Sequence, residues 1–105
     1  MIVGEYGIPF RLGVNYDLSA ATSLTLVFTK PDRSTLSVTN PDVSVGSLPI
    51  NTNVGNFAAN TYVTYTFQSG DVDQHGQWSV RLTYEDASPK RLYSKISHFT
   101  IAQNA

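Results

Sequence analysis

The chain has 105 residues, the usual length of one domain, so we expect residues 1–105 to fold around one core. It contains no cysteine, which excludes disulfides, cysteine-based zinc sites and a thiol nucleophile. Seven Lys and Arg balance eight Asp and Glu without any basic run, and we therefore expect no nucleic-acid binding.

The composition favours strands over helices. β-branched and aromatic residues are abundant, including six Tyr and five Phe, whereas the strong helix formers Glu and Lys are scarce. No apolar run approaches the roughly 20 residues that span a bilayer, and no signal peptide is visible. We expect no membrane insertion and, if Met1 is the native start, a small gene product made in a cytoplasm.

The first predicted elements are one strand and a hairpin. Ile8, Phe10, Leu12 and Val14 alternate with polar or small residues, and Pro9 favours an edge position because it lacks an N–H. Strands at 23–30 and 35–39 are joined by a turn at 31–34, where Pro31 presets φ. Their alternation predicts five inward side chains: Leu24, Leu26, Phe28, Leu36 and Val38.

The middle of the chain is irregular. Residues 40–60 are rich in Asn, Pro and Gly and allow one short strand. A connection of this length is usually functional or packs on a neighbour. The strand predicted at 62–67 carries sizeable side chains on both faces, so it is either central or covered by something else.

The final predicted strands run from Trp78 to Tyr84 and from Arg91 to Ile101. In the last one, Leu92 and Ile96 share one parity while Phe99 and Ile101 share the other, and a β-bulge near Ser97 would reconcile them. About seven short strands without helical periodicity predict an all-β fold, a two-sheet antiparallel sandwich. A small Greek-key barrel is the alternative.

The polar residues do not form a catalytic pattern. His75 lies in a loop and His98 in a strand, and no known nucleophile, metal or phosphate motif is present. Asp71 and Asp73 supply too few oxygen ligands for calcium, and an acid/base role in glycoside hydrolysis would need a deep cleft. We expect turn-capping roles for them, and we predict no enzymatic activity, no metal and no cofactor.

The aromatic residues divide into core and surface candidates. Trp78 opens an alternating apolar stripe and is expected in the core, with sugar stacking as the alternative. Four tyrosines are candidates for surface aromatics, a residue type that is enriched where proteins bury surface against other proteins: Tyr6, Tyr16, Tyr62 and Tyr93.

Three segments carry a family resemblance. Residues 17–22 (DLSAAT), 28–33 (FTKPDR) and 70–78 (GDVDQHGQW) occur in the order seen in small domains of tailed-bacteriophage virion proteins, such as the N-terminal domain of upper baseplate proteins. The chain resembles these immunoglobulin-like domains over most of residues 8–101. Arg33 stands where that family normally has Gly. The corner at Asp73, Gly76 and Trp78 also resembles immunoglobulin-like domains, although it is one residue longer than in antibodies and no cysteine follows.

The resemblance implies an immunoglobulin-like antiparallel β-sandwich that binds other virion proteins. We expect a structural component of the tail, baseplate, neck or fibre base, present in several symmetry-related copies and assembled in the host cytoplasm. A capsid decoration protein of the same fold is one alternative. A carbohydrate-binding or host-surface adhesion module that recognises a glycan is the other.

Contacts are expected at backbone edges and flanking segments rather than in a pocket. The expected contact regions are the N-terminal arm (1–6), the first strand, the 40–60 connection and the start of the following strand. We also expect a neighbouring subunit to hold the arm and the C-terminal tail (102–105). The candidate contact residues are Ile2, Val3, Tyr6, Pro9, Val43, Val45, Leu48, Ile50 and Tyr62.

Overall fold

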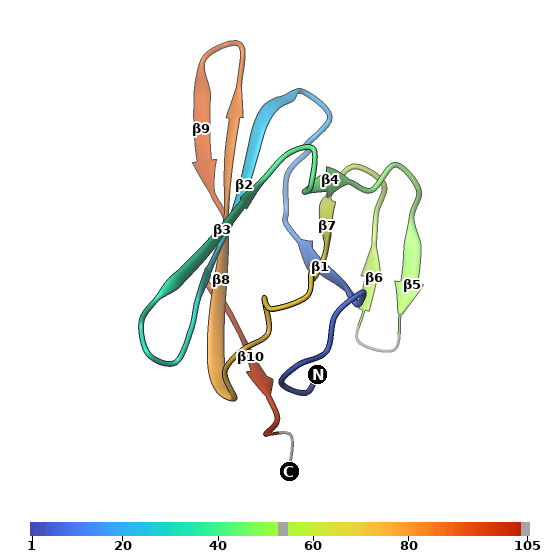
Figure 1. Cartoon of the computed structure of the whole chain (residues 1–105). Helices are drawn as coiled ribbons and strands as arrows, with labels where there is room; N and C mark the ends of the chain where they lie inside the picture. Colours follow the sequence, from blue (N-terminus) through green and yellow to red (C-terminus); the bar gives the residue numbers. More distant parts are fainter. Residues whose placement is uncertain (53–54, 104–105) are drawn as a thin grey trace.

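The computed structural model describes residues 1–52 and 55–103, and this part of the chain contains strands and no helix (Figure 1). The strands are β1 (Pro9–Gly13), β2 (Ala21–Thr29), β3 (Thr35–Thr39), β4 (Ser44–Val45), β5 (Ile50–Thr52), β6 (Gly55–Phe57), β7 (Tyr62–Thr66), β8 (Gly76–Asp86), β9 (Lys90–Tyr93) and β10 (Ser97–Ile101). These residues include no helix that could cross a membrane.

Two antiparallel sheets form an open sandwich, as Figure 1 shows. The three-stranded sheet has the order β1-β7-β4, and the five-stranded sheet has the order β10-β8-β2-β3, with β9 also paired to β8. Strands β5 and β6 form a separate two-stranded ribbon. The all-β prediction is confirmed, and the described strands form separate sheets rather than a closed barrel. The two main sheets contain eight strands, not about seven.

The core lies between the sheets and is built from the predicted alternating side chains. Phe28 is fully buried, and its ring centroid lies 5.2–6.5 Å from those of five other aromatic rings, namely Phe10, Tyr65, Phe67, Trp78 and Phe99. Full burial of one such side chain stabilises the fold by about 1.5–3 kcal/mol. Trp78 is also fully buried, and its indole N–H donates to the Gln74 carbonyl at 3.1 Å. The predicted core position of Trp78 is confirmed.

The predicted hairpin at 22–39 is confirmed by the pairing of β2 with β3. Its turn is closed by a hydrogen bond from the Arg33 N–H to the Lys30 carbonyl at 2.9 Å, with Pro31 at the second position. Arg33 has a φ of 72°. A left-handed residue after the turn is typical of three-residue hairpin loops and is normally Gly. Arg33 therefore adopts a conformation that Gly normally adopts at this position of such a loop.

The 40–60 connection is more structured than expected. It contains β4, β5 and β6 instead of one short strand, while residues 53–54 of this prediction lie outside the described part. Strand β7 is central, between β1 and β4, as the side chains on both of its faces indicated. Its Tyr62 is buried on the outer face, where its ring packs against Phe57 at a centroid distance of 5.6 Å and its hydroxyl donates to the Leu48 carbonyl at 2.7 Å.

The predicted last strand is divided into β9 and β10, which both pair with the same side of β8. The register shifts by one residue between the pairs Thr83↔Tyr93 and Val80↔Ser97. The parity change is therefore confirmed, but it occurs at residues 94–96, before Ser97. The inward position predicted for Ile96 is wrong, because the shift comes before it and leaves its side chain 58% exposed.

Candidate functional site

The nine predicted contact residues occupy different environments. Four are exposed: Ile2, Tyr6, Pro9 and Leu48. Val3, Val45 and Ile50 are half-buried. Val43 and Tyr62 are 1% and 5% exposed, so the structure places their side chains in the interior of this chain and not on its surface. Val43 belongs to the hydrophobic core, whereas the Tyr62 ring lies against Gly46 and its hydroxyl donates to the Leu48 carbonyl, in the connection after β4.

The exposed candidates do not form one surface. Directly after the N-terminal arm, the Gly7 N–H donates to the carbonyl of Phe67, the residue that follows β7, at 2.8 Å. Leu48 contacts the beginning of β7 through the Tyr62 hydroxyl. Five residues of a strand separate these points, a length of about 16 Å.

The chain itself holds the arm. The Val3 N–H donates to the Ala102 carbonyl at 3.1 Å, the Ala102 N–H donates to the Met1 carbonyl at 2.9 Å, and Ile2 forms a parallel bridge with Ala102. These bonds within the chain hold the arm, and the expected contact with a neighbouring subunit stays a prediction. Residues 104–105 of the predicted tail lie outside the described part.

The two acidic candidates serve the fold. Asp71 accepts hydrogen bonds from the Tyr65 hydroxyl and from the Gln68 N–H, the latter at 2.8 Å, which confirms its predicted turn-capping role. Burial and the bond to Asp71 raise the pKa of Tyr65 well above its usual value. Asp73 instead pairs with Lys30 at 2.9 Å. Among the described residues, no group of three His, Cys, Asp or Glu side chains is arranged to hold a metal ion.

Both histidines are exposed, as expected for a loop residue at position 75 and a strand-surface residue at position 98. Trp78 has no exposed ring face on which a sugar could stack. Tyr6 and Tyr93 are 65% and 54% exposed, as predicted. Tyr16 is half-buried, with its ring centroid 5.9 Å from that of Tyr84.

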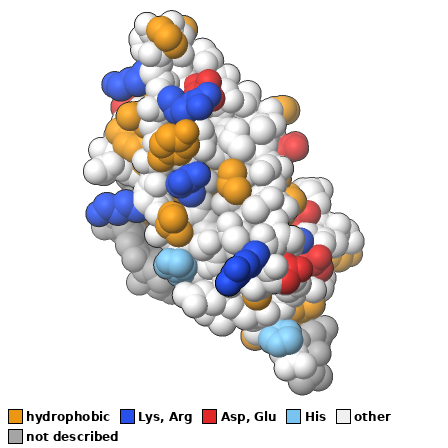
Figure 2. All heavy atoms as spheres, turned by 90° about the vertical axis from the view of Figure 1, so that its left-hand side faces the viewer, with side chains coloured by type: hydrophobic (Ala, Val, Ile, Leu, Met, Phe, Trp, Pro, Cys, Tyr) orange, Lys and Arg blue, Asp and Glu red, His pale blue; other side chains and the backbone are white. Residues whose placement is uncertain are grey.

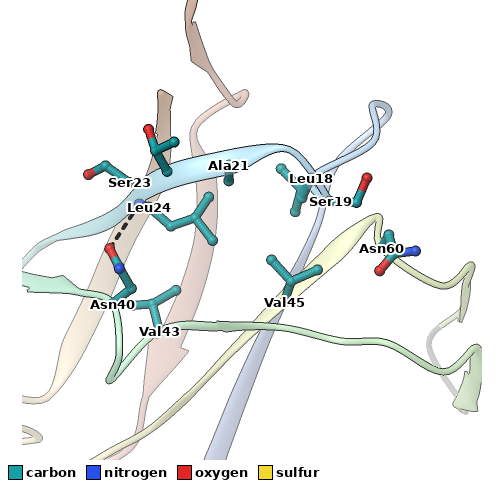
Figure 3. Close-up of a pocket in the computed structure, with 10 residues that line it drawn as sticks. Leu18, Ser19, Ala21, Ser23, Leu24, Asn40, Val43, Val45 and Asn60 are labelled. Atoms are coloured by element: carbon teal, nitrogen blue, oxygen red, sulfur yellow. Dashed lines mark hydrogen bonds between the residues drawn. The ribbon is translucent and has the colours of Figure 1, made fainter. Parts of the chain in front are cut away.

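A hollow of about 350 Å³ lies between the start of β2 and the segment that contains β4. Figure 3 shows Leu24, Val43 and Val45 around it, and Asn40 accepts a hydrogen bond from the Leu24 N–H at 3.3 Å. Its remaining lining residues are Leu18, Ser19, Ala21, Thr22, Ser23 and Asn60. The hollow offers hydroxyl and amide groups, but none of these ten residues carries a titratable side chain.

A larger groove, of about 870 Å³, lies between the edge of β1 and the edge formed by β9 and β10. Phe10, Leu12 and Phe99 contribute apolar surface to it. The rings of Phe10 and Phe99, with centroids 5.2 Å apart, join the two sheets there. The volume lies within the range of typical ligand pockets, about 300–1,000 Å³.

Among the described residues, no strand pairs with the groove-side backbone edge of β1 or of β10. In β1, hydrogen bonds at Ile8 and Val14 direct the even-numbered residues toward β7. By alternation, the backbone groups of the odd-numbered residues of β1 point away from β7, toward the groove. Pro9 therefore lies at a sheet edge, as predicted. Ala102, directly after β10, bonds to the arm. His98 and Thr100 share its parity, so their backbone groups also point away from β8.

The charges at the groove have one sign. Arg11, Lys95 and His98 are exposed and line it, whereas no Asp or Glu is among the described residues that do so. The chain as a whole has a net charge of -1, so this is a local concentration of basic groups. Figure 2 shows Lys and Arg side chains interleaved with hydrophobic ones on the outer face of the adjoining five-stranded sheet. There Arg81 stacks over the ring of Tyr93 at 4.8 Å.

Most of this surface was not predicted from the sequence. Lys95 and Arg11 gave no signal, since isolated basic residues are ordinary at a protein surface. The parity change in the last predicted strand could have indicated this surface, because it marks where the Ile96 side chain turns outward.

Comparison of the chain with protein-family models, with curated proteins and with solved structures finds no match.

Proposed function

We propose that this chain is a structural component of a tailed-bacteriophage virion. It has an immunoglobulin-like fold, assembles with other virion proteins in several symmetric copies, and acts through surface contacts rather than catalysis. The observation that carries this proposal is the free β9–β10 edge beside an open groove. Exposed strand edges with unpaired N–H and C=O groups are surfaces to which another chain can add.

The order of the strands supports the immunoglobulin-like assignment. In that fold, strands B, E and D share one sheet, while G, F, C and C′ share the other. The sheets β1-β7-β4 and β10-β8-β2-β3 match these orders when β1, β2, β3, β4, β7, β8 and β9–β10 are taken as B, C, C′, D, E, F and G. The match also keeps the strands in chain order, with β5–β6 as an insertion before E.

The phage assignment rests on the sequence resemblance, and the residues that carry it make contacts within and between their segments. Lys30 of the second segment pairs with Asp73 of the third at 2.9 Å and lies 5.6 Å from the centre of the Trp78 ring. The Asp32 N–H donates to the Gln74 side chain at 3.3 Å. In the first segment, Asp17 accepts a bond from the Ser19 N–H at 2.8 Å. Residues that carry the resemblance therefore have specific roles in the fold.

The experiment is to locate and count the chain in purified particles of the phage that encodes it. Quantitative mass spectrometry of the particles measures copy number, and electron microscopy of the same particles locates the chain. We expect several symmetry-related copies at the tail, baseplate, neck or fibre base. Copies spread over the capsid would indicate a decoration protein, and absence from the particles would contradict the proposal.

Removal of residues 1–6 is an unsuitable test of arm contacts, because those residues bond to Ala102 and Val72 and their loss would also destabilise the sandwich. The sharper variant is Ile2→Ser combined with Tyr6→Ser, since both side chains are exposed. If the arm binds a neighbour, this variant enters particles less efficiently while its thermal stability is unchanged. Ser47→Ala, at another exposed position, is the control.

A further inference from the structure

We propose that an extended, acidic segment of a partner protein adds as a strand to the free edge of β10 and fills the groove between β10 and β1. This inference rests on the proposed function, which it deepens by giving the chemistry of the partner. The occupant has apolar side chains at alternate positions and carboxylates at the positions between them.

The backbone favours β10 over β1 as the strand that is extended. Among the described residues no strand pairs with the outer side of β10, apart from the bridge at Ala102. His98 and Thr100 therefore present two N–H donors and two carbonyl acceptors there. The outer side of β1 includes Pro9, which has no N–H, so β1 offers a poorer ladder.

The arm indicates that this edge accepts a strand. Its Ile2 already lies parallel to Ala102 at the end of β10. A partner segment along residues 96–100 would continue the same edge, just beyond the arm. Five residues of such a segment span about 16 Å.

The groove accounts for the apolar side chains at alternate positions of the proposed partner segment. A strand added to β10 directs every second side chain between the two sheets, where Phe10, Leu12 and Phe99 provide apolar surface. Burial of those side chains supplies most of the affinity, at roughly 25 cal/mol per Å² of apolar area removed from water.

The basic residues at the groove account for the carboxylates of the proposed partner segment. The side chains between the apolar ones lie near the groove rim, where Arg11, Lys95 and His98 are exposed and no acidic residue of the described part competes for them. Such charges mainly raise the association rate and exclude basic partners. An acidic segment is therefore selected over a basic one of equal hydrophobicity.

The test measures binding of the full chain to a fluorescent peptide of about seven residues, in which Val alternates with Glu; its extended length is about 23 Å. We expect a saturable rise in anisotropy, at least tenfold weaker binding of the same peptide with Lys in place of Glu, and slower amide exchange at His98 and Thr100. Absence of saturable binding, or equal binding of the two peptides, would overturn the proposal.

Two variants locate the site. Lys95→Glu is expected to weaken binding about fivefold through the lost charge contact. Thr100→Pro removes a free-edge N–H and is expected to weaken binding about tenfold. The matched control is Ser37→Pro on β3, whose backbone likewise faces away from its neighbour at the opposite edge of the same sheet. If Thr100→Pro fails to fold, amide exchange in the unmodified chain decides the question.

The outcomes separate this inference from the proposed function. A chain that is present in particles but binds neither peptide retains its structural role and loses the strand-addition site. A chain that binds the acidic peptide but is absent from particles retains the site and loses the virion role.

Discussion

Replacement of Gly46 by alanine is predicted to destabilise the fold, because the Tyr62 ring packs directly against the Gly46 backbone. A Cβ atom at position 46 would overlap the far end of the Tyr62 ring. The φ of Gly46 is not in the left-handed region, so alanine would fit the backbone and the whole effect would come from this overlap. Carbon atoms separate to about 3.5–4.0 Å, and the ring would therefore have to move by about 1.5 Å.

The cost follows from what holds the ring. Moving it breaks the 2.7 Å hydrogen bond from the Tyr62 hydroxyl to the Leu48 carbonyl, a loss of about 1 kcal/mol. It also disturbs a buried ring packed against Phe57, and overpacking of this kind costs about 1–3 kcal/mol. Gly46→Ala is thus expected to lower the free energy of unfolding by about 2–4 kcal/mol.

Urea denaturation at neutral pH measures this loss, with an unchanged slope as evidence that the unfolded state is unaffected. In a Tyr62→Val background the ring is gone, and Gly46→Ala should then cost less than about 0.5 kcal/mol. Ser47→Ala, at an exposed neighbouring position, is the control. A cost for Gly46→Ala that is the same in both backgrounds would refute the steric explanation.

Three further predictions concern the turn, the corner and the core. Arg33→Gly should raise the free energy of unfolding by about 1 kcal/mol, because Arg33 holds a φ of 72° that costs a side-chain-bearing residue about that much; an unchanged urea midpoint would contradict this. Tyr65→Phe should lower stability at pH 7 by about 1.5–3 kcal/mol through loss of the bond to Asp71. Since the folded-state pKa of Tyr65 is raised, its stabilisation is complete below the unfolded value of about 10 and is lost as the pH rises further. The Tyr65→Phe variant should therefore lose less stability than the unmodified chain in titrations above pH about 10, and equal losses would contradict this explanation. Phe28→Ala should cost about 3–5 kcal/mol, more than Phe99→Ala at a half-buried position, and calorimetry showing the reverse order would place the centre of the core elsewhere.

Several local features were predictable because they depend on neighbouring residues alone. Pro31 with the polar residues after it indicated the hairpin turn, and Pro9 indicated an edge. Asp71 was expected to cap a turn and does so through the Gln68 N–H. Each of these inferences rests on the geometry of a few successive residues.

The candidate contact residues were less predictable. Val43 lies in the irregular 40–60 connection, and Tyr62 lies in a strand with sizeable side chains on both faces. Both patterns suggested surface contacts, yet both side chains are buried. Val43 packs in the core and Tyr62 packs under the connection after β4, and the alternation pattern specifies neither position. Ile96 is the opposite case, since a one-residue register shift places it on the surface.

Period-two alternation predicted an all-β chain with two apolar layers, because this periodicity is a property of the pleated strand and needs no knowledge of its neighbours. Which strand edges are left unpaired and which basic side chains meet at the groove could not be predicted from the alternation pattern. Those features depend on strand order and register, which bring Arg11 of β1 and His98 of β10 to one groove from positions far apart in the chain.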